Sequence, residues 1–377
     1  MIRNAKHTID LITFLWQDDE VGLKIAHELA AAVKRGVRVR VMIDAYNGKK
    51  HDESYRILEE AGAPVMPFTP AIAPPVNLNL HIHYKIMTVD GTEALIGGAN
   101  ICDEYMIGGE RGLWHDLEYW ARGPVVSEMQ VELDTFWDDL AISTTRIMRG
   151  YDELLSSTSS SAQAPWKPNG KTWTPDYARG GASLPGTATA LLEFQDSESE
   201  GKPAGNQMSA HYQYLLGLAK KEIIIYGPYS YFRRDFQRAV YAAAKRGVKV
   251  RLLTNGPDTN DMPNMWIMAP VADYDDLMAA GVEVYEVQDR TLHAKAIWLD
   301  GEVMTVGSHN YYPRSFNFTG EAAVLTDDPN AIEKFRLMAE VDFGIALRIT
   351  PEILVEKMHG FKAKWGLFWG TLLRGVI

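Results

Sequence analysis

The chain carries the same pattern twice, and this repeat limits its possible folds more than any other feature. Residues 31–41 read AAVKRGVRVRV and residues 242–252 read AAAKRGVKVRL, an offset of 211. Upstream of each copy, apolar residues follow the i, i+4, i+7, i+8 spacing of one helical face. Each copy then passes through a glycine suited to a helix C-cap, Gly36 or Gly247, into a β-branched alternating stretch. The repeat predicts two α/β lobes of the same fold, each a central sheet flanked by helices.

Length and composition agree with two lobes. The 377 residues exceed one ordinary compact core, and 46% hydrophobic with 23% charged residues is typical of globular proteins. We expect a first lobe at residues 1–150, a Ser/Pro/Gly-rich linker at 151–187, a second lobe at 188–345 and an amphipathic tail at 346–377. The first lobe is expected to lack the opening strand and helix that the second has near 190–194 and 208–219. The linker is either solvated or leans its aromatic residues Trp166, Trp173 and Tyr177 over a site between the lobes.

Charge, cysteine content and hydropathy exclude several classes of protein. With 38 Lys and Arg against 49 Asp and Glu, the net charge of −11 argues against nucleic acid as a partner. The single cysteine, Cys102, rules out an intramolecular disulfide and a cysteine cluster for zinc, and it indicates a reducing compartment. The sequence has no signal peptide and no apolar run long enough to cross a bilayer. We therefore expect a cytoplasmic protein.

A second repeated motif carries the chemistry. A histidine and a lysine two residues apart recur at an offset of 210, and in a strand both side chains of such a pair project from one face. Five residues after each lysine an aspartate precedes a glycine, where we expect it to hold a turn by Asx-type hydrogen bonds. A Gly-rich segment ending in asparagine follows each time. The motif residues are His83, Lys85, Asp90 and Asn100 in the first copy, and His293, Lys295, Asp300 and Asn310 in the second.

Two histidines and two lysines suit attack on a phosphodiester. One imidazole can be the nucleophile, the other the general acid for the leaving alcohol, and the ammonium groups can neutralise the phosphoryl oxygens. The competing interpretation is a metal site, but lysine is not a usual ligand, and we expect neither metal nor other cofactor. His81 shares the spacing of His83 but its counterpart is Thr291, so we treat it as a neighbour.

These motifs resemble those of the phospholipase D superfamily, and the resemblance covers nearly the whole chain. The amino-acid sequence of residues 96–105, followed by Trp114-His115-Asp116, is similar to sequences of the bacterial cardiolipin synthase branch. The resemblance implies two lobes face to face around a pseudo-twofold axis, with the site at their junction. Two positions depart from that branch, which carries aspartate where this chain has Tyr312 and asparagine where it has Thr319; the nearby residues Arg314, Ser315 and Glu321 match.

The same resemblance implies a role for each site residue. His83 would form a covalent phosphatidyl-histidine intermediate, and His293 would protonate the departing alcohol and later activate the acceptor. Carboxylates would orient the histidine of the opposite lobe, Asp116 for His293 and Glu321 for His83. The remaining phosphate-binding groups would be Lys85, Lys295, Asn100 and Asn310.

The function expected from this family is transfer of a phosphatidyl group between phospholipids. The alternatives are hydrolysis of phospholipid to phosphatidic acid, a nucleic-acid phosphodiesterase and a non-catalytic scaffold. The expected partners are a phosphatidylglycerol-like lipid and the membrane surface, with a monomer that forms an internal pseudo-dimer. Residues 361–377 combine aromatic and basic side chains with no acidic one, so this segment either docks peripherally on anionic lipid at the inner membrane or packs on the second lobe.

Overall fold

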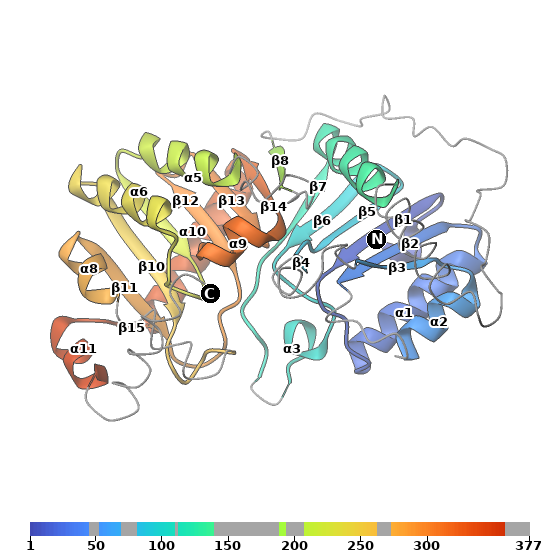
Figure 1. The fold of residues 1–377 in the computed structure, drawn as a ribbon, viewed down its shortest axis with the longest axis horizontal. Coiled ribbons are helices and arrows are strands. Elements are labelled where there is room, and N and C mark those ends of the chain that lie inside the picture. The colour runs from blue at the N-terminus through green and yellow to red at the C-terminus, as the bar shows by residue number, and fades with distance from the viewer. Residues whose placement is uncertain are drawn as a thin grey trace, which may run out of the picture.

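The computed structural model describes residues 1–44, 53–68, 81–109, 112–138, 188–193, 207–261 and 273–358. Two lobes lie side by side, with the first lobe drawn in blue and teal and the second in green to red (Figure 1). The expected linker at 151–187 and the tail segment 361–377 lie outside the described residues. Within the described part of the chain, no helix combines the length and apolar character needed to cross a membrane.

The first lobe contains a six-stranded mixed sheet in the order β3-β2-β1-β5-β6-β7. β1, β2 and β3 are parallel, whereas β5, β6 and β7 are antiparallel to their neighbours. The strands are β1 (Thr8–Thr13), β2 (Arg38–Asp44), β3 (Val65–Phe68), β5 (Ile86–Val89), β6 (Glu93–Gly97) and β7 (Glu118–Arg122). Helices α1 (Glu20–Lys34) and α2 (Glu53–Ala61) pack on one face and the helical residues 124–138 on the other; η1 (Ile2–Asn4) and α3 (Asp103–Met106) complete the lobe.

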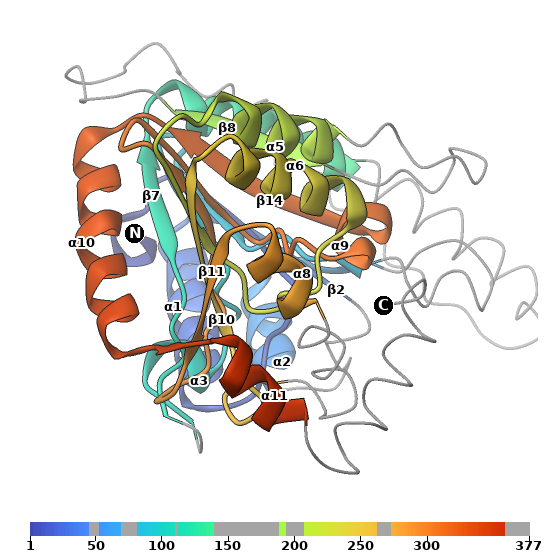
Figure 2. The same ribbon diagram turned by 90° about the vertical axis from the view of Figure 1, so that its left-hand side faces the viewer.

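The second lobe repeats this order as β11-β10-β9-β12-β13-β14 and extends it with β15, β8 and β4. Figure 2 shows α5 and α6 on one side of the sheet and α10 on the other. The strands are β8 (Ala188–Glu193), β9 (Glu222–Tyr226), β10 (Lys249–Asn255), β11 (Val282–Val287), β12 (Lys295–Leu299), β13 (Val303–Gly307), β14 (Thr319–Thr326) and β15 (Leu347–Arg348). The helices are α5 (Gln207–Leu218), α6 (Arg234–Lys245), α8 (Tyr274–Ala279), α9 (Pro313–Phe318), α10 (Pro329–Ile345) and α11 (Pro351–Met358). The prediction of two α/β lobes with one fold is confirmed.

The repeated Arg-Gly-Val text has the local structure that its pattern predicts. α1 and α6 end one residue before the arginine, and the glycines that follow, Gly36 and Gly247, have φ of 91° and 89°. A residue in the left-handed conformation at this position ends the helix, and glycine adopts that conformation without steric strain because it has no Cβ. The chain can then turn directly into β2 or β10, each of which lies between two parallel neighbours in its sheet.

The motif aspartates hold a different backbone segment from the one expected. Asp90 and Asp300 lie in the turns with φ of 53° and 56°. Their carboxylates do not bond within those turns: each accepts from three successive backbone N–H groups, at residues 6–8 for Asp90 and 220–222 for Asp300, at 2.7–3.2 Å. The two aspartates therefore fasten the entrance of the first parallel strand of each lobe, β1 or β9.

The lobes exchange short strand pairings at their junction. β4 (His81–Ile82) of the first lobe pairs in parallel with the start of β14, and a matching bridge joins His115 to Leu292 of the second lobe. The hydrophobic cluster under β4 includes Ala322 from β14, so the contact is a packed core as well as a backbone contact. Because each exchange lies immediately before a motif histidine, the junction brings both histidines to one place.

Candidate active site

The His-Lys pairs lie at the entrances of strands and not within them. His83 and Lys85 follow β4 and precede β5, and His293 precedes β12, which begins at Lys295. All four residues are buried, with 2–8% of their surface exposed. Lys85 Nζ donates to the carbonyl oxygen of His83 at 2.9 Å, and Lys295 Nζ lies 2.9 Å from Nε2 of His293. Each lysine therefore stays beside the histidine of its own pair.

Each motif histidine contacts a carboxylate from the opposite lobe. Nδ1 of His83 lies 2.9 Å from Oε2 of Glu321, and Nδ1 of His293 lies 2.7 Å from Oδ2 of Asp116. These crossed contacts, which the resemblance implied, are confirmed. They assign the imidazole proton to Nδ1 in both rings. Nε2 of His83 is then left to face a substrate, whereas Nε2 of His293 contacts Lys295 Nζ in this structure.

The strand exchange explains why the carboxylates cross. The N–H group of His83 donates to the carbonyl oxygen of Gly320 at 2.8 Å, one residue before Glu321. By the same geometry, the N–H group of His293 donates to the carbonyl oxygen of His115 at 2.8 Å, one residue before Asp116. A backbone pairing between lobes thus fixes the position of each side-chain pair.

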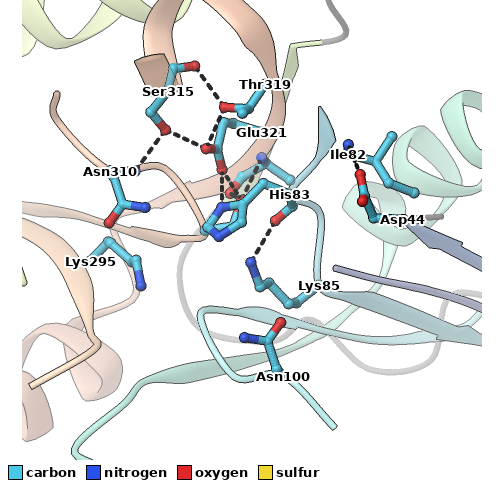
Figure 3. Close-up of polar contacts among 12 residues, drawn as sticks. Asp44, Ile82, His83, Lys85, Asn100, Lys295, Asn310, Ser315, Thr319 and Glu321 are labelled. Carbon is cyan, nitrogen blue, oxygen red and sulfur yellow. Dashed lines mark hydrogen bonds and ion pairs between the residues drawn. The ribbon is translucent and has the colours of Figure 1, made fainter. Parts of the chain in front are cut away.

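Three hydroxyl groups surround Glu321, and the sequence did not reveal this arrangement. Ser308 Oγ donates to Oε2 at 2.6 Å, Thr319 Oγ1 donates to Oε1 at 2.9 Å, and Ser315 Oγ also donates to Oε1 (Figure 3). Burial alone would raise the pKa of Glu321, but His83, with smaller contributions from His309 and Lys85, lowers it to about 2. Thr319, where the resemblance implied asparagine, therefore still donates a hydrogen bond to this carboxylate.

The Gly-rich turn gives Asp116 its room. A Cβ at Gly98 would lie 2.3 Å from Oδ1 of Asp116, so a larger residue there would collide with the carboxylate that contacts His293. In the second lobe the corresponding residue is Ser308, whose side chain contacts Glu321 instead. The glycine is required in one lobe only, because the two carboxylates approach their turns differently.

Burial and the two lysines set the protonation state of the site. Burial, with further contributions from Lys85 and Lys295, lowers the pKa of His83 to about 3 in spite of Glu321. Burial also lowers the pKa of His293, and it lowers the pKa of Lys295 to about 8 and that of Lys85 well below its ordinary value. At neutral pH His83 is therefore a neutral imidazole with a free lone pair on Nε2, the form that a nucleophile needs.

The motif asparagines lie beside the lysines around the His83 imidazole (Figure 3). Asn100 accepts from the N–H group of Leu15 at 3.3 Å and donates to the Tyr105 hydroxyl at 3.0 Å. Asn310 is 2% exposed, and its Oδ1 has no hydrogen-bond partner within the described residues. Donation from both amides to a phosphoryl oxygen stays a prediction.

Several aromatic residues touch the histidines, and no repeated spacing marked them. The Phe14 ring lies 4.8 Å from the His83 ring, and the Tyr105 and Trp114 rings lie 5.1 and 5.8 Å from the His293 ring. Tyr105 and Trp114 stand in the text that resembles the family, which was the available signal. His81 is a neighbour as expected, with Nδ1 3.1 Å from Asp44.

One group of described residues has the spacing of metal ligands. Asp19, Cys102 and Glu104 have potential ligand atoms within 4.8 Å of one another. Both oxygens of Asp19 already accept backbone N–H bonds, from Gly22 and Asp103, which gives this carboxylate a structural use at the start of α1. We assign no metal to it.

Comparisons with known proteins agree with this geometry. The family model described as "Cardiolipin synthase, PLD-like domain" matches residues 1–137 and 213–341. Cardiolipin synthase B of Escherichia coli (strain K12) is 30% identical over 332 residues, which cover 87% of this chain and 72% of that protein. Cardiolipin synthase C of the same strain is 28% identical over 392 residues, with 92% and 82% covered.

A solved structure shares the fold over the whole length. The phosphatidylserine synthase of Haemophilus influenzae Rd KW20 superposes with a TM-score of 0.68 at 17% identity, covering 100% of this chain and 91% of the other. Taken with the paired lobes and the crossed histidine–carboxylate contacts, the family match leads to one conclusion: this chain belongs to the cardiolipin synthase family of phospholipase D-like proteins.

Proposed function

We propose that this enzyme is a phosphatidyltransferase of the cardiolipin synthase type, which moves a phosphatidyl group from one phospholipid to the alcohol of another through a covalent intermediate on His83. The family match supports the reaction class. The observation that carries the proposal is the pair of buried histidines, each hydrogen-bonded through Nδ1 to a carboxylate of the opposite lobe. That arrangement suits two proton-transfer and bond-forming roles at one phosphorus atom.

In the first half of the reaction, the Nε2 lone pair of His83 forms a bond to phosphorus while the bond from phosphorus to the leaving alcohol breaks. The proton on Nε2 of His293 passes to the departing oxygen, so a neutral alcohol leaves. The ammonium groups of Lys85 and Lys295 neutralise the non-bridging oxygens. A bound diester anion also offsets the positive charge of the lysines and raises the pKa of His293 toward the range in which it holds that proton.

In the second half, the acceptor hydroxyl enters where the first alcohol left. His293, now neutral, takes the hydroxyl proton, and the alkoxide oxygen forms a bond to phosphorus as the bond to His83 Nε2 breaks. Glu321 and Asp116 keep their imidazoles in the required tautomer throughout. His83 is released neutral, and the two halves together exchange one alcohol for another.

Incubation with phosphatidylglycerol vesicles, followed by lipid mass spectrometry, tests the reaction. Formation of cardiolipin with release of glycerol supports transfer. Phosphatidic acid without cardiolipin would identify a hydrolase, and an unchanged lipid would overturn the proposal in both forms.

The assignment of nucleophile and acid has a separate test. His83→Ala is expected to abolish turnover, whereas His293→Ala retains the nucleophile and should accumulate a phosphorylated intermediate from a diester with a p-nitrophenol leaving group, which departs without a proton. Equal labelling of the two variants, measured by intact-protein mass spectrometry, would contradict the assignment.

The proposal extends to peripheral membrane association of a monomer in the cytoplasm. All the site residues come from one chain, which supports a monomer, and residues 361–377 have the composition of an interfacial anchor. Deleting residues 365–377 is expected to weaken sedimentation with anionic liposomes more than it lowers the melting temperature. Unchanged liposome binding by the truncated protein, or its unfolding at a much lower temperature, would show that residues 365–377 are not the docking surface. Light scattering tests whether the protein is a monomer.

A further inference from the structure

The two halves of the site fold alike but carry different side chains at equivalent positions. Ile9 and Ile223 occupy equivalent positions in the two lobes. Ile9 pairs with Val89 and Ile223 pairs with Leu299, and Val89 and Leu299 are separated by the same offset of 210 as the two motifs. The motif asparagines and the crossed carboxylates fix the other equivalences. At four such positions one half has an aromatic residue and the other a smaller side chain: Tyr229 for Leu15, Tyr312 for Cys102, Tyr105 for Ser315, and Trp114 for Thr319.

Tyr105 and Trp114, from the first lobe, lie against His293. Their rings are 5.1 and 5.8 Å from the imidazole and 4.9 Å from each other. The indole Nε1 of Trp114 is buried and has no hydrogen-bond partner in the described part of the chain. An unpartnered donor costs free energy that an added acceptor would recover.

Tyr229 and Tyr312 belong to the second lobe and contact each other. Their rings are 5.6 Å apart, and the Tyr229 hydroxyl lies 3.0 Å from both oxygens of Asp261. Asn255 connects this group to His293, because its Nδ2 donates to the carbonyl oxygen before Tyr229 at 3.1 Å and to the one before His293 at 2.7 Å. The exposed Asp261 acts electrostatically on Lys295 and His293, which raises the pKa of both against the lowering by burial.

The His83 side of the site offers nothing comparable among the described residues. There the Phe14 ring contacts the imidazole and lies 5.0 Å from Lys85 Nζ. The serine and threonine that replace the aromatic residues, Ser315 and Thr319, direct their hydroxyls to Glu321 and are buried. Among the described residues, tyrosine hydroxyls, an unpartnered indole N–H group and an exposed carboxylate are therefore combined beside His293 and not beside His83.

We propose that Tyr229, Tyr312, Trp114 and Asp261 form a subsite for the alcohol of the lipid headgroup, and that this subsite recognises a polyol through its vicinal hydroxyls. A hydroxyl can donate to the Asp261 carboxylate and accept from the Tyr312 hydroxyl or from the indole N–H of Trp114, whereas an ammonium group only donates and would face Lys295. The carbon face of a polyol can pack on the aromatic rings. The inference rests on the proposed function, in which the leaving and the accepting alcohol both occupy the place beside His293.

A competition between acceptor alcohols tests this subsite. The full chain is given a phosphatidyl donor with a p-nitrophenol leaving group and equal concentrations of glycerol, 1-propanol and ethanolamine, and the phosphatidyl products are counted by mass spectrometry. We expect at least about tenfold more phosphatidylglycerol than phosphatidylpropanol. Asp261→Asn and Tyr229→Phe should each reduce that ratio about fivefold or more.

Asp258→Asn is the matched control, since Asp258 is an exposed aspartate three residues away on the same loop, and it should leave the ratio unchanged. If the enzyme releases p-nitrophenol, an unaltered product ratio in Asp261→Asn would overturn the polyol subsite. A preference of the unmodified enzyme for ethanolamine over glycerol would overturn it as well. Absence of that release from the unmodified enzyme, even to water, would instead refute the proposed function and the subsite with it.

Discussion

Replacing Gly98 by alanine should damage catalysis while leaving the fold intact. The added Cβ would lie 2.3 Å from Oδ1 of Asp116, which is about 1 Å closer than ordinary non-bonded contact. The obstacle is the end of a side chain, so the Asp116 carboxylate can yield without moving the backbone. A shift of about 1 Å would stretch its 2.7 Å contact with His293 beyond hydrogen-bond distance.

Misplacement of this size costs about 100-fold in rate, equivalent to about 2.7 kcal/mol in the activation free energy. The assay is kcat for p-nitrophenol release, together with thermal unfolding. Gly344→Ala provides the same chemical change on α10, where a Cβ meets nothing within 4 Å, and it should keep full activity.

The reasoning also predicts non-additivity between the two residues. If Gly98→Ala acts through Asp116, the double variant Gly98→Ala/Asp116→Ala should be no slower than Asp116→Ala alone. Normal kcat in Gly98→Ala, additive losses in the double variant, or a large drop in melting temperature would each refute the argument.

Three further outcomes are expected. Thr319→Val removes the 2.9 Å hydrogen bond to Glu321 and should lower kcat about tenfold, while Thr319→Ser should restore most of it; equal rates would show that this hydroxyl is dispensable. Since the pKa of Lys295 is about 8, its ammonium is present below pH 8 and lost above it. KM for an anionic diester should therefore rise about tenfold between pH 7 and 9, and a flat KM profile would contradict this. Asp90→Ala and Asp300→Ala each lose hydrogen bonds to three backbone N–H groups and place alanine at φ of 53° or 56°. Urea denaturation should therefore give an unfolding free energy lower by about 2–4 kcal/mol, and an unchanged midpoint would argue against their structural role.

Much of the fold could be predicted from the sequence, because its signals are local. The spacing of apolar residues and the glycine at the end of each helix predict a helix followed directly by a strand, and this pattern occurs in both copies of the repeat. The pairing of His83 with Lys85, and of His293 with Lys295, also depends only on residues two apart. The placement of both histidines inside a strand was wrong, because the residues just before each histidine pair with the opposite lobe.

The crossed contacts lie beyond what local signals can specify. His83 and Glu321 are 238 positions apart, and His293 and Asp116 are 177 apart, so no periodicity within either lobe relates them; family resemblance supplied that expectation. The hydroxyls around Glu321 and the aromatic residues around His293 had no such guide. The three hydroxyls come from the same lobe as Glu321, whereas Tyr105 and Trp114 reach His293 from the opposite lobe.

The sequence by itself thus determined the two lobes, the helix that leads into a strand in each of them and the residue types needed for phosphoryl transfer. The tertiary structure decided why Gly98 needs to be small, and it decided which groups surround the site residues, with hydroxyls around Glu321 and aromatic rings around His293. The physical reason is that helix and strand formation depend on neighbours in the chain, whereas the protonation and orientation of the site depend on groups that meet only when the lobes pack.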